Sequence, residues 1–164
     1  MAYAVTTLGG AQQIADTSDT KKHPLGTIVR GWDPTYGEGE FIYLLGVAST
    51  VVGSPVTFDA VTYQTALAAV GTSLPRRIAF AMSANLAAGY GWYQISGMCV
   101  ASKAATICCV AGAAVGVKTT GLISKTGSGK EISSALVAAT ASAATGRITV
   151  LLSIDRPSMQ GRIT

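Results

Sequence analysis

The residue types that carry catalysis are scarce in this chain, beginning with its single histidine. His23 follows two lysines and precedes a proline, at the end of a polar stretch. A catalytic base has to be held at a fixed position beside a nucleophile or a metal ion. The position of His23 instead predicts a solvated side chain, so the chain lacks the base that a Ser/His or Cys/His site requires.

Two glutamates and one glycine-rich segment are the other catalytic candidates in the sequence. Glu38 and Glu40 would share one strand face, as paired carboxylates can, but they lead into an apolar run and are interpreted as a polar rim. The segment 125–131 reads KTGSGKE, yet Ser124 and Glu131 stand where a phosphate-binding loop needs glycine and serine or threonine. We therefore predict a hairpin tip there and no enzyme.

The three cysteines offer no metal site. Cys99, Cys108 and Cys109 form no CxxC pair, and neighbouring residues of a strand point to opposite faces. Free cysteines are among the most buried residue types. We expect small core side chains in a reducing compartment, with neither metal nor cofactor.

The spacing of turn residues predicts an all-β fold. From Leu25 onward, short apolar runs alternate with Gly, Pro, Ser and Thr every 8 to 12 residues. This predicts a single β-sandwich or β-barrel-like domain over 25–164, preceded by an extended N-terminal arm over 1–24. Residues 63–70 and 134–144 have helical propensity, although the Ser and Thr content of the second favours a β excursion or loop. The expected strands are 26–32, 40–45, 55–58, 77–82, 90–95, 98–101, 106–110, 115–119, 131–136 and 147–155.

The arm consists of polar and small residues without a hydrophobic period. We expect it to become ordered along a neighbouring subunit, by adding backbone hydrogen bonds to an exposed strand edge. The side chains expected to enter shallow pockets of that neighbour are those of Tyr3, Val5, Leu8 and Ile14. Lys21 and Lys22 would then face an acidic partner surface where the arm leaves the body.

Composition indicates a protein that works with partners. Charged residues make up 12% of the chain, about half of the usual share of roughly 25%. The longest apolar run, 104–117, is too short to span a bilayer, and the N-terminus has neither a basic n-region nor an apolar h-region. We expect no membrane segment, no signal peptide, and synthesis in a cytoplasm.

Charge is distributed unevenly along the chain. The first 59 residues hold six acidic and three basic side chains, whereas the remainder holds nine basic and two acidic ones. The basic residues stand singly, without the stripe that phosphate tracking needs, so we predict no specific nucleic acid. An acidic protein partner, or head-to-tail packing of the chain with itself, explains the asymmetry. Arg76 and Arg77 are candidate contact residues.

The largest side chains gather in the segment 90–95, YGWYQI. On a strand, Tyr90 and Trp92 face one way while Tyr93 and Ile95 face the other. Either both faces belong to the core, or Tyr90 and Trp92 form an interface, where Trp and Tyr often dominate binding energy. The sequence leaves both alternatives open.

Three blocks of the body resemble a known group of proteins. They are residues 26–47 (GTIVRGWDPTYGEGEFIYLLGV), 79–97 (AFAMSANLAAGYGWYQISG) and 147–161 (RITVLLSIDRPSMQG). Their joint pattern is similar to head decoration, or cement, proteins of tailed bacteriophages. The blocks span most of the body and leave out the arm.

The resemblance implies a β-rich protein without enzymatic activity, located on the outer surface of the virion capsid after synthesis in the bacterial host cytoplasm. Such a protein binds the icosahedral head at symmetry axes, clamps major capsid protein subunits, and associates with itself as a homotrimer or homodimer. The alternative from the residues is a carbohydrate-type β-sandwich binding module on a virion or cell surface, with Trp92 as its stacking platform. A free module would carry more surface charge and would not need an arm.

Overall fold

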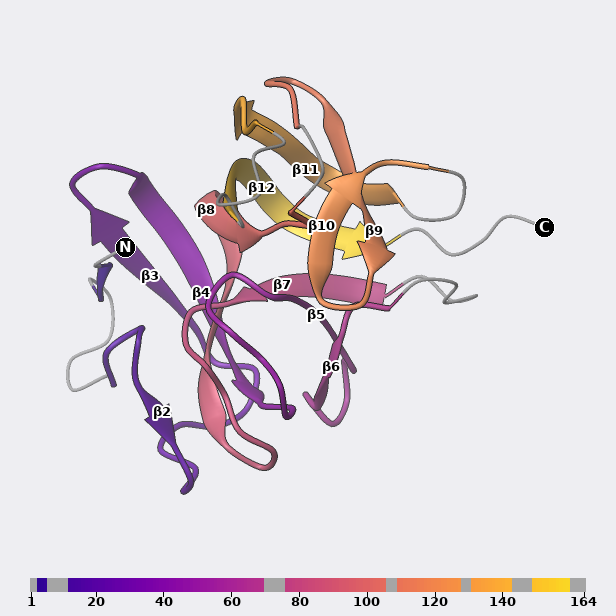
Figure 1. Cartoon of the computed structure of the whole chain (residues 1–164). Helices are drawn as coiled ribbons and strands as arrows, with labels where there is room; N and C mark the ends of the chain where they lie inside the picture. Colours follow the sequence, from indigo (N-terminus) through magenta and orange to yellow (C-terminus); the bar gives the residue numbers. More distant parts are fainter. Residues whose placement is uncertain are drawn as a thin grey trace.

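A computed structural model describes residues 3–5, 12–69, 76–105, 109–127, 131–142 and 149–159, and within these ranges the chain is all-β without helix. This confirms the predicted fold class (Figure 1). The strands are β1 (Ala4–Val5), β2 (Thr17–Ser18), β3 (Ile28–Asp33), β4 (Gly37–Leu45), β5 (Pro55–Phe58), β6 (Thr65–Leu67), β7 (Arg76–Ala81), β8 (Tyr90–Ser102), β9 (Ala114–Thr119), β10 (Leu122–Lys125), β11 (Glu131–Ala139) and β12 (Thr149–Met159).

The strands form one large antiparallel sheet that does not close on itself, in the order β1-β3-β4-β8-β7-β12-β11-β9-β10. Strand β8 joins its two halves, because its first part pairs with β4 and its second part pairs with β12. Gly97 lies at the change of partner with φ +98°, a conformation that residues with a Cβ rarely adopt. β5, β6 and β7 run between the two groups of strands (Figure 1).

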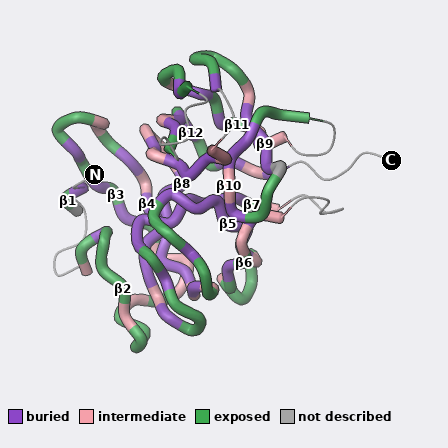
Figure 2. The backbone as a smooth tube through the Cα atoms, viewed as in Figure 1, coloured by how far each residue is buried: buried purple, intermediate pink, exposed green. Residues whose placement is uncertain are grey.

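Buried residues concentrate on the central strands β4, β7 and β8 (Figure 2). The register of β4 on β8 places Tyr43 opposite Trp92 and Ile42 opposite Tyr93. Since neighbouring residues point to opposite faces, Trp92 packs in one hydrophobic cluster and Tyr93 in another. Both faces of the 90–95 segment are therefore core, which resolves the alternative that the sequence left open.

Several predicted elements differ from the structure. The expected strands 90–95 and 98–101 are one continuous strand, and the segment with helical propensity at 63–70 contains β6. Strand β11 continues to Ala139, and β10 was not predicted.

The predicted hairpin tip at 125–131 is wrong, because β10 and β11 pair with opposite edges of β9. Of the expected strand 106–110, residues 106–108 lie outside the described ranges, and Cys109 forms an isolated bridge with Ala141.

The described parts of the 1–24 segment pack onto the body of their own chain. β1 pairs with β3, and β2 pairs with the start of β8. Tyr3 and Ile14 are buried in the cluster that contains Phe41, Tyr43 and Trp92. This corrects the expectation that these two side chains wait for a neighbouring subunit, because the aromatic face of β4 and β8 already covers them. Among the described residues, no helix has the length and apolar character to cross a membrane.

Candidate functional site

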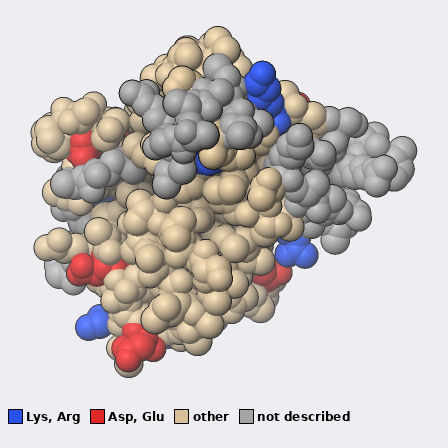
Figure 3. All heavy atoms as spheres, viewed as in Figure 1, with Lys and Arg blue, Asp and Glu red and all other residues tan. Residues whose placement is uncertain are grey.

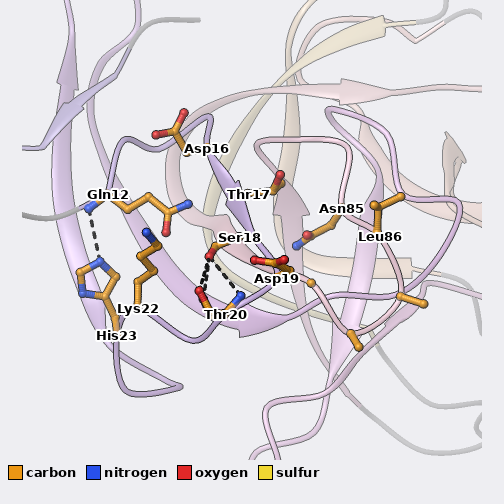
Figure 4. Close-up of a pocket in the computed structure, with 13 residues that line it drawn as sticks. Gln12, Asp16, Thr17, Ser18, Asp19, Thr20, Lys22, His23, Asn85 and Leu86 are labelled. Atoms are coloured by element: carbon orange, nitrogen blue, oxygen red, sulfur yellow. Dashed lines mark hydrogen bonds between the residues drawn. The ribbon is translucent and has the colours of Figure 1, made fainter.

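A groove of about 940 Å³ lies between two segments that are far apart in the sequence (Figure 4). One wall is residues 12–23, the 12–23 segment, and the other is the loop that joins β7 to β8, the 82–89 loop. Polar side chains and loop backbone line this groove: Gln12, Asp16, Thr17, Ser18, Asp19, Thr20, Lys22, His23, Asn85, Leu86, Ala87, Ala88 and Gly89.

Buried contacts hold the 12–23 segment against the sheet. The indole Nε1–H of Trp92 donates to the carbonyl of Gln12 at 3.1 Å, and Ile14 is buried beside the Trp92 cluster. The backbone of Thr17 and Ser18 pairs with the first residues of β8. This wall is consequently part of the folded body, with its polar side chains facing the groove.

His23 is fixed in place, which corrects the prediction that nothing holds it. Its ring centroid lies 5.2 Å from that of Tyr43 and 5.4 Å from that of Trp92. Its Nε2 accepts a hydrogen bond from the backbone N–H of Gln12 at 3.3 Å. The sequence neighbours of His23 did not predict this packing, because the two rings come from β4 and β8.

The acidic side chains of the groove are exposed. Asp16 and Asp19 flank β2, and neither forms an ion pair with another described residue. Ser18 and Thr20 hold the intervening turn, because the Ser18 Oγ accepts from the Thr20 N–H at 3.2 Å. Two carboxylates therefore lie on one wall of the groove, and neither forms an ion pair within the described ranges.

The opposite wall contains a buried amide. Asn85 is 2% exposed, and its Nδ2 donates to the Tyr93 hydroxyl at 3.0 Å. Glycines surround the side chain: a Cβ on Gly46, Gly89 or Gly91 would come within 3.0 Å of it. The sequence gave no signal for Asn85 or Gln12, since the groove exists only after the two segments meet.

The predicted contact residues of the arm and of the aromatic strand are placed as follows. Burial in the chain's own core replaces the expected partner contact for Tyr3, Ile14 and Trp92, so Trp92 cannot serve as a carbohydrate platform. Tyr90 is half-buried and stacks on Tyr43. Among the other arm residues, Val5 pairs with Gly31. Lys21 and Lys22 are exposed, and Leu8 lies outside the described residues.

The predicted basic contacts lie at the start of β7. Arg76 is half-buried and Arg77 is exposed, and both pair with the end of β12. Arg77 borders a second, smaller hollow of about 310 Å³ with an apolar floor that includes Ile42 and Phe58. These two arginines are therefore separate from the groove, and the structure does not bring them together with Lys21 and Lys22 in one lining.

The outward face of β3 is a further surface, which the sequence analysis did not single out. Ile28 is 47% exposed and Trp32 is 50% exposed, and Arg30 lies between them on the same face. Arg30 and Arg156 both contact Glu40, at 3.5 Å and 2.9 Å. In the sequence, Ile28, Arg30 and Trp32 stand at alternate positions of the expected strand 26–32 and therefore share one face. This spacing is the signal that could have identified the surface.

The thiols and acids form no metal centre in the described ranges, where no three His, Cys, Asp or Glu residues gather to hold an ion. Cys99 and Cys109 are buried, as expected, and Cys108 lies outside these ranges. Burial raises the pKa of the Cys99 thiol well above its ordinary value. Cys99 is consequently held as an unreactive thiol in the core.

Comparison with protein-family models, with curated proteins and with solved structures gives no match for this chain. The fold and the surfaces described above are therefore the basis for its function.

Proposed function

We propose that this chain is a decoration, or cement, protein of a tailed-bacteriophage head, without enzymatic activity. It binds the outer surface of the icosahedral capsid and stabilises the contacts between major capsid protein subunits. The resemblance of blocks 26–47, 79–97 and 147–161 supports this role. These blocks supply much of the antiparallel framework, because they include β3, β4, β12, the second half of β7 and most of β8.

The outward face of β3 is the observation that carries the proposal. Ile28 and Trp32 expose about half of their side chains on one face of this strand, with Arg30 between them. Trp and Arg are enriched among the residues that dominate protein interfaces, where they are surrounded by contacts that exclude water. A face with an apolar residue at each end and a cation between them suits a protein surface better than a small molecule.

The low surface charge supports the same role. Figure 3 shows mostly uncharged described side chains on the visible face, with isolated basic and acidic residues. Charged residues account for 12% of the whole chain. Interfaces are depleted in charge at their centres, so a chain that covers part of a shell and is covered by its neighbours has less need of surface charge.

Purified particles test the proposal directly. Electron microscopy is expected to find this chain in many copies on the outside of the head. Recombinant protein should bind to heads that lack it, and Trp32→Ala should weaken that binding at least about tenfold, the effect of a hot-spot residue. The matched control is Val61→Ala, because Val61 is 85% exposed on a loop away from β3.

Two results would overturn the proposal. One is the absence of the chain from purified heads, and the other is equal binding by Trp32→Ala and the wild-type protein. Circular dichroism and thermal unfolding of both variants show whether each is folded before binding is compared. The carbohydrate alternative lacks its stacking platform, because Trp92 is buried in the core.

A further inference from the structure

The hollow of about 310 Å³ beside β3 combines an apolar floor with a basic rim. Four strands each supply one buried side chain to its floor: Ile42, Phe58, Ile78 and Ile95. Its accessible lining is mostly apolar, and Ile28, which is 47% exposed, forms part of the wall. Covering such a surface with an apolar group removes it from water, which is favourable.

Two arginines give the rim of this hollow a positive charge. Arg77 is exposed and forms no ion pair with another described residue. Arg156 is also exposed, and it shares the carboxylate of Glu40 with Arg30. The acid that follows the floor in the sequence, Asp59, accepts hydrogen bonds within its own turn instead. No acidic side chain is found among the described residues that line the hollow, so a carboxylate from outside would complement the rim.

The backbone of β12 is irregular where it borders the hollow. Its buried positions alternate up to Ile154 and resume one position out of phase at Pro157. The pairing with β11 shifts register over the same residues, and Arg156 between them has φ +45°. Irregularities of this kind re-aim side chains and often lie next to functional sites. Here the backbone buries Pro157 in the wall and leaves the Arg156 side chain exposed at the rim.

We infer that this hollow receives an apolar side chain of a protein partner that carries a carboxylate beside it, such as a leucine next to an aspartate. The apolar group would displace water from the floor, and the carboxylate would accept hydrogen bonds from the guanidinium of Arg77. A phosphate group would pair with arginine but gain nothing from the floor. An apolar side chain alone would cover the arginines without pairing them.

The inference rests on the proposed function, because it names the chemistry of the capsid surface that meets the hollow. Ile28 belongs both to the hollow and to the outward face of β3, so one partner would cover Trp32 and the hollow together. This continuity favours a protein over a free amphiphile, which would fill the hollow and leave Trp32 exposed.

Titration of the full-length protein with short capped peptides tests the chemistry of the hollow. The probes are acetyl-Gly-Leu-Asp-Gly-amide, an analogue with asparagine in place of aspartate, and an analogue with alanine in place of leucine. The first peptide is expected to bind with a Kd of about 1 mM. It should shift the NMR signals of the Arg77 Nε–H and of the methyl groups of the floor isoleucines. Each analogue should bind at least about fivefold more weakly, because it lacks the charge or most of the apolar surface.

A charge-matched pair of variants separates the hollow from general attraction between opposite charges. Arg77→Gln should weaken binding of the first peptide at least about fivefold. Lys21→Gln removes the same charge from a position outside the hollow and should leave binding unchanged. Both positions are exposed, so both variants are expected to fold, which thermal unfolding verifies. On heads that lack the chain, Arg77→Gln should weaken binding by a similar factor.

The inference and the proposed function fail in distinguishable ways. Absence of peptide shifts at the hollow, equal affinity for the three peptides, or equal loss in Arg77→Gln and Lys21→Gln would overturn the inference. Unchanged binding of Arg77→Gln to heads would do the same, even where Trp32→Ala weakens that binding. Failure of the wild-type protein to bind heads would overturn the proposed function, whereas the peptide titration would still show whether the hollow binds this chemistry.

Discussion

At the scale of single residues, Tyr3 shows how one side chain ties the first residues of the chain to the body. Its hydroxyl donates to the carbonyl of Met98 at 2.8 Å, and its ring meets that of Phe41 edge to face at 4.9 Å. Burial raises the pKa of Tyr3 from 10.0 to about 12. The folded state therefore favours the neutral phenol, whereas the unfolded chain loses this proton near pH 10.

The raised pKa of Tyr3 predicts loss of stability in alkali. A group whose pKa is higher in the folded state contributes fully below pH 10 and loses that contribution between pH 10 and about 12. Tyr3→Phe should lower the free energy of unfolding by about 1 kcal/mol at pH 7, the value of one hydrogen bond. It should also reduce the decline above pH 10. Urea unfolding at pH 7 and pH 11 measures both effects, and an unchanged alkaline decline would contradict the role of Tyr3.

At the scale of elements, Gly97 allows β8 to pair with β4 in one half of the sheet and with β12 in the other. A Cβ there would collide with the carbonyl oxygen of Glu38 and lie 3.0 Å from the Cα of Gly39, in a backbone with φ +98°. Gly37 is the matched control, since its φ is +76° but no atom lies within 4 Å of its Cβ position. The two sites separate backbone strain from steric collision.

We expect Gly97→Ala to lower the free energy of unfolding by about 3 kcal/mol or more, because strain and collision add. Gly37→Ala should cost about 1 kcal/mol from strain alone. Chemical denaturation of both variants gives the comparison. Equal losses at the two positions would show that the close approach of β4 to β8 at Gly97 does not matter.

The 12–23 segment is the second element with a testable role. Ile14 is buried against the cluster that contains Trp92, and its truncation leaves a cavity there. Ile14→Ala should cost about 3 kcal/mol, whereas the change of its exposed neighbour, Gln13→Ala, should stay within about 0.5 kcal/mol. Thermal or urea unfolding measures both, and a cost for Ile14→Ala as small as that of Gln13→Ala would show that the segment only rests on the surface.

The extended arm expected over 1–24 predicts a body that still folds after deletion of residues 2–22. The packing of this segment predicts the opposite. The structure places Tyr3 and Ile14 in the same cluster as Tyr43 and Trp92, so the deletion would expose two aromatic side chains of the core. Point substitutions on exposed positions are consequently the better probes of partner binding.

At the scale of the whole molecule, the opposite charge of the chain's two parts predicts self-association. Residues 1–59 carry an excess of acidic side chains and residues 60–164 an excess of basic ones. Copies can then meet with complementary surfaces, and closed point groups are the usual result. We expect a mass two or three times 16.6 kDa, with the trimer slightly favoured.

Sedimentation equilibrium over a range of protein and salt concentrations measures this mass. Added salt should favour dissociation, because the attraction between complementary charges is screened within about 10 Å at 0.1 M. A protein that stays monomeric at high concentration, and that is also monomeric on the particle, would contradict the prediction. Trp32→Ala in the same experiment shows whether the outward face of β3 also joins copies of the chain.

Local sequence patterns determined the all-β class and most strands. The alternation of apolar and polar residues and the turn residues between them act over a few positions, which is why β5 was predicted at its observed bounds. The last strand was expected over 147–155, before Pro157, yet β12 continues to Met159. The pairing of β12 with β8 ends at Asp155 and its pairing with β7 begins at Ser158, so the missing N–H of Pro157 falls where neither ladder needs it.

Only the tertiary structure determined the contacts of the first residues and the formation of the groove. The indole N–H of Trp92 donates to the carbonyl of Gln12 across 80 positions of sequence, and His23 packs against two rings supplied by β4 and β8. No local pattern encodes such contacts, because the aromatic face that buries Tyr3 and Ile14 forms only when β4 pairs with β8. The sequence by itself determined most of the segments that become strands. The burial of Asn85 and the formation of the groove depended on long-range packing, which brings together residues that have no periodic relation to one another.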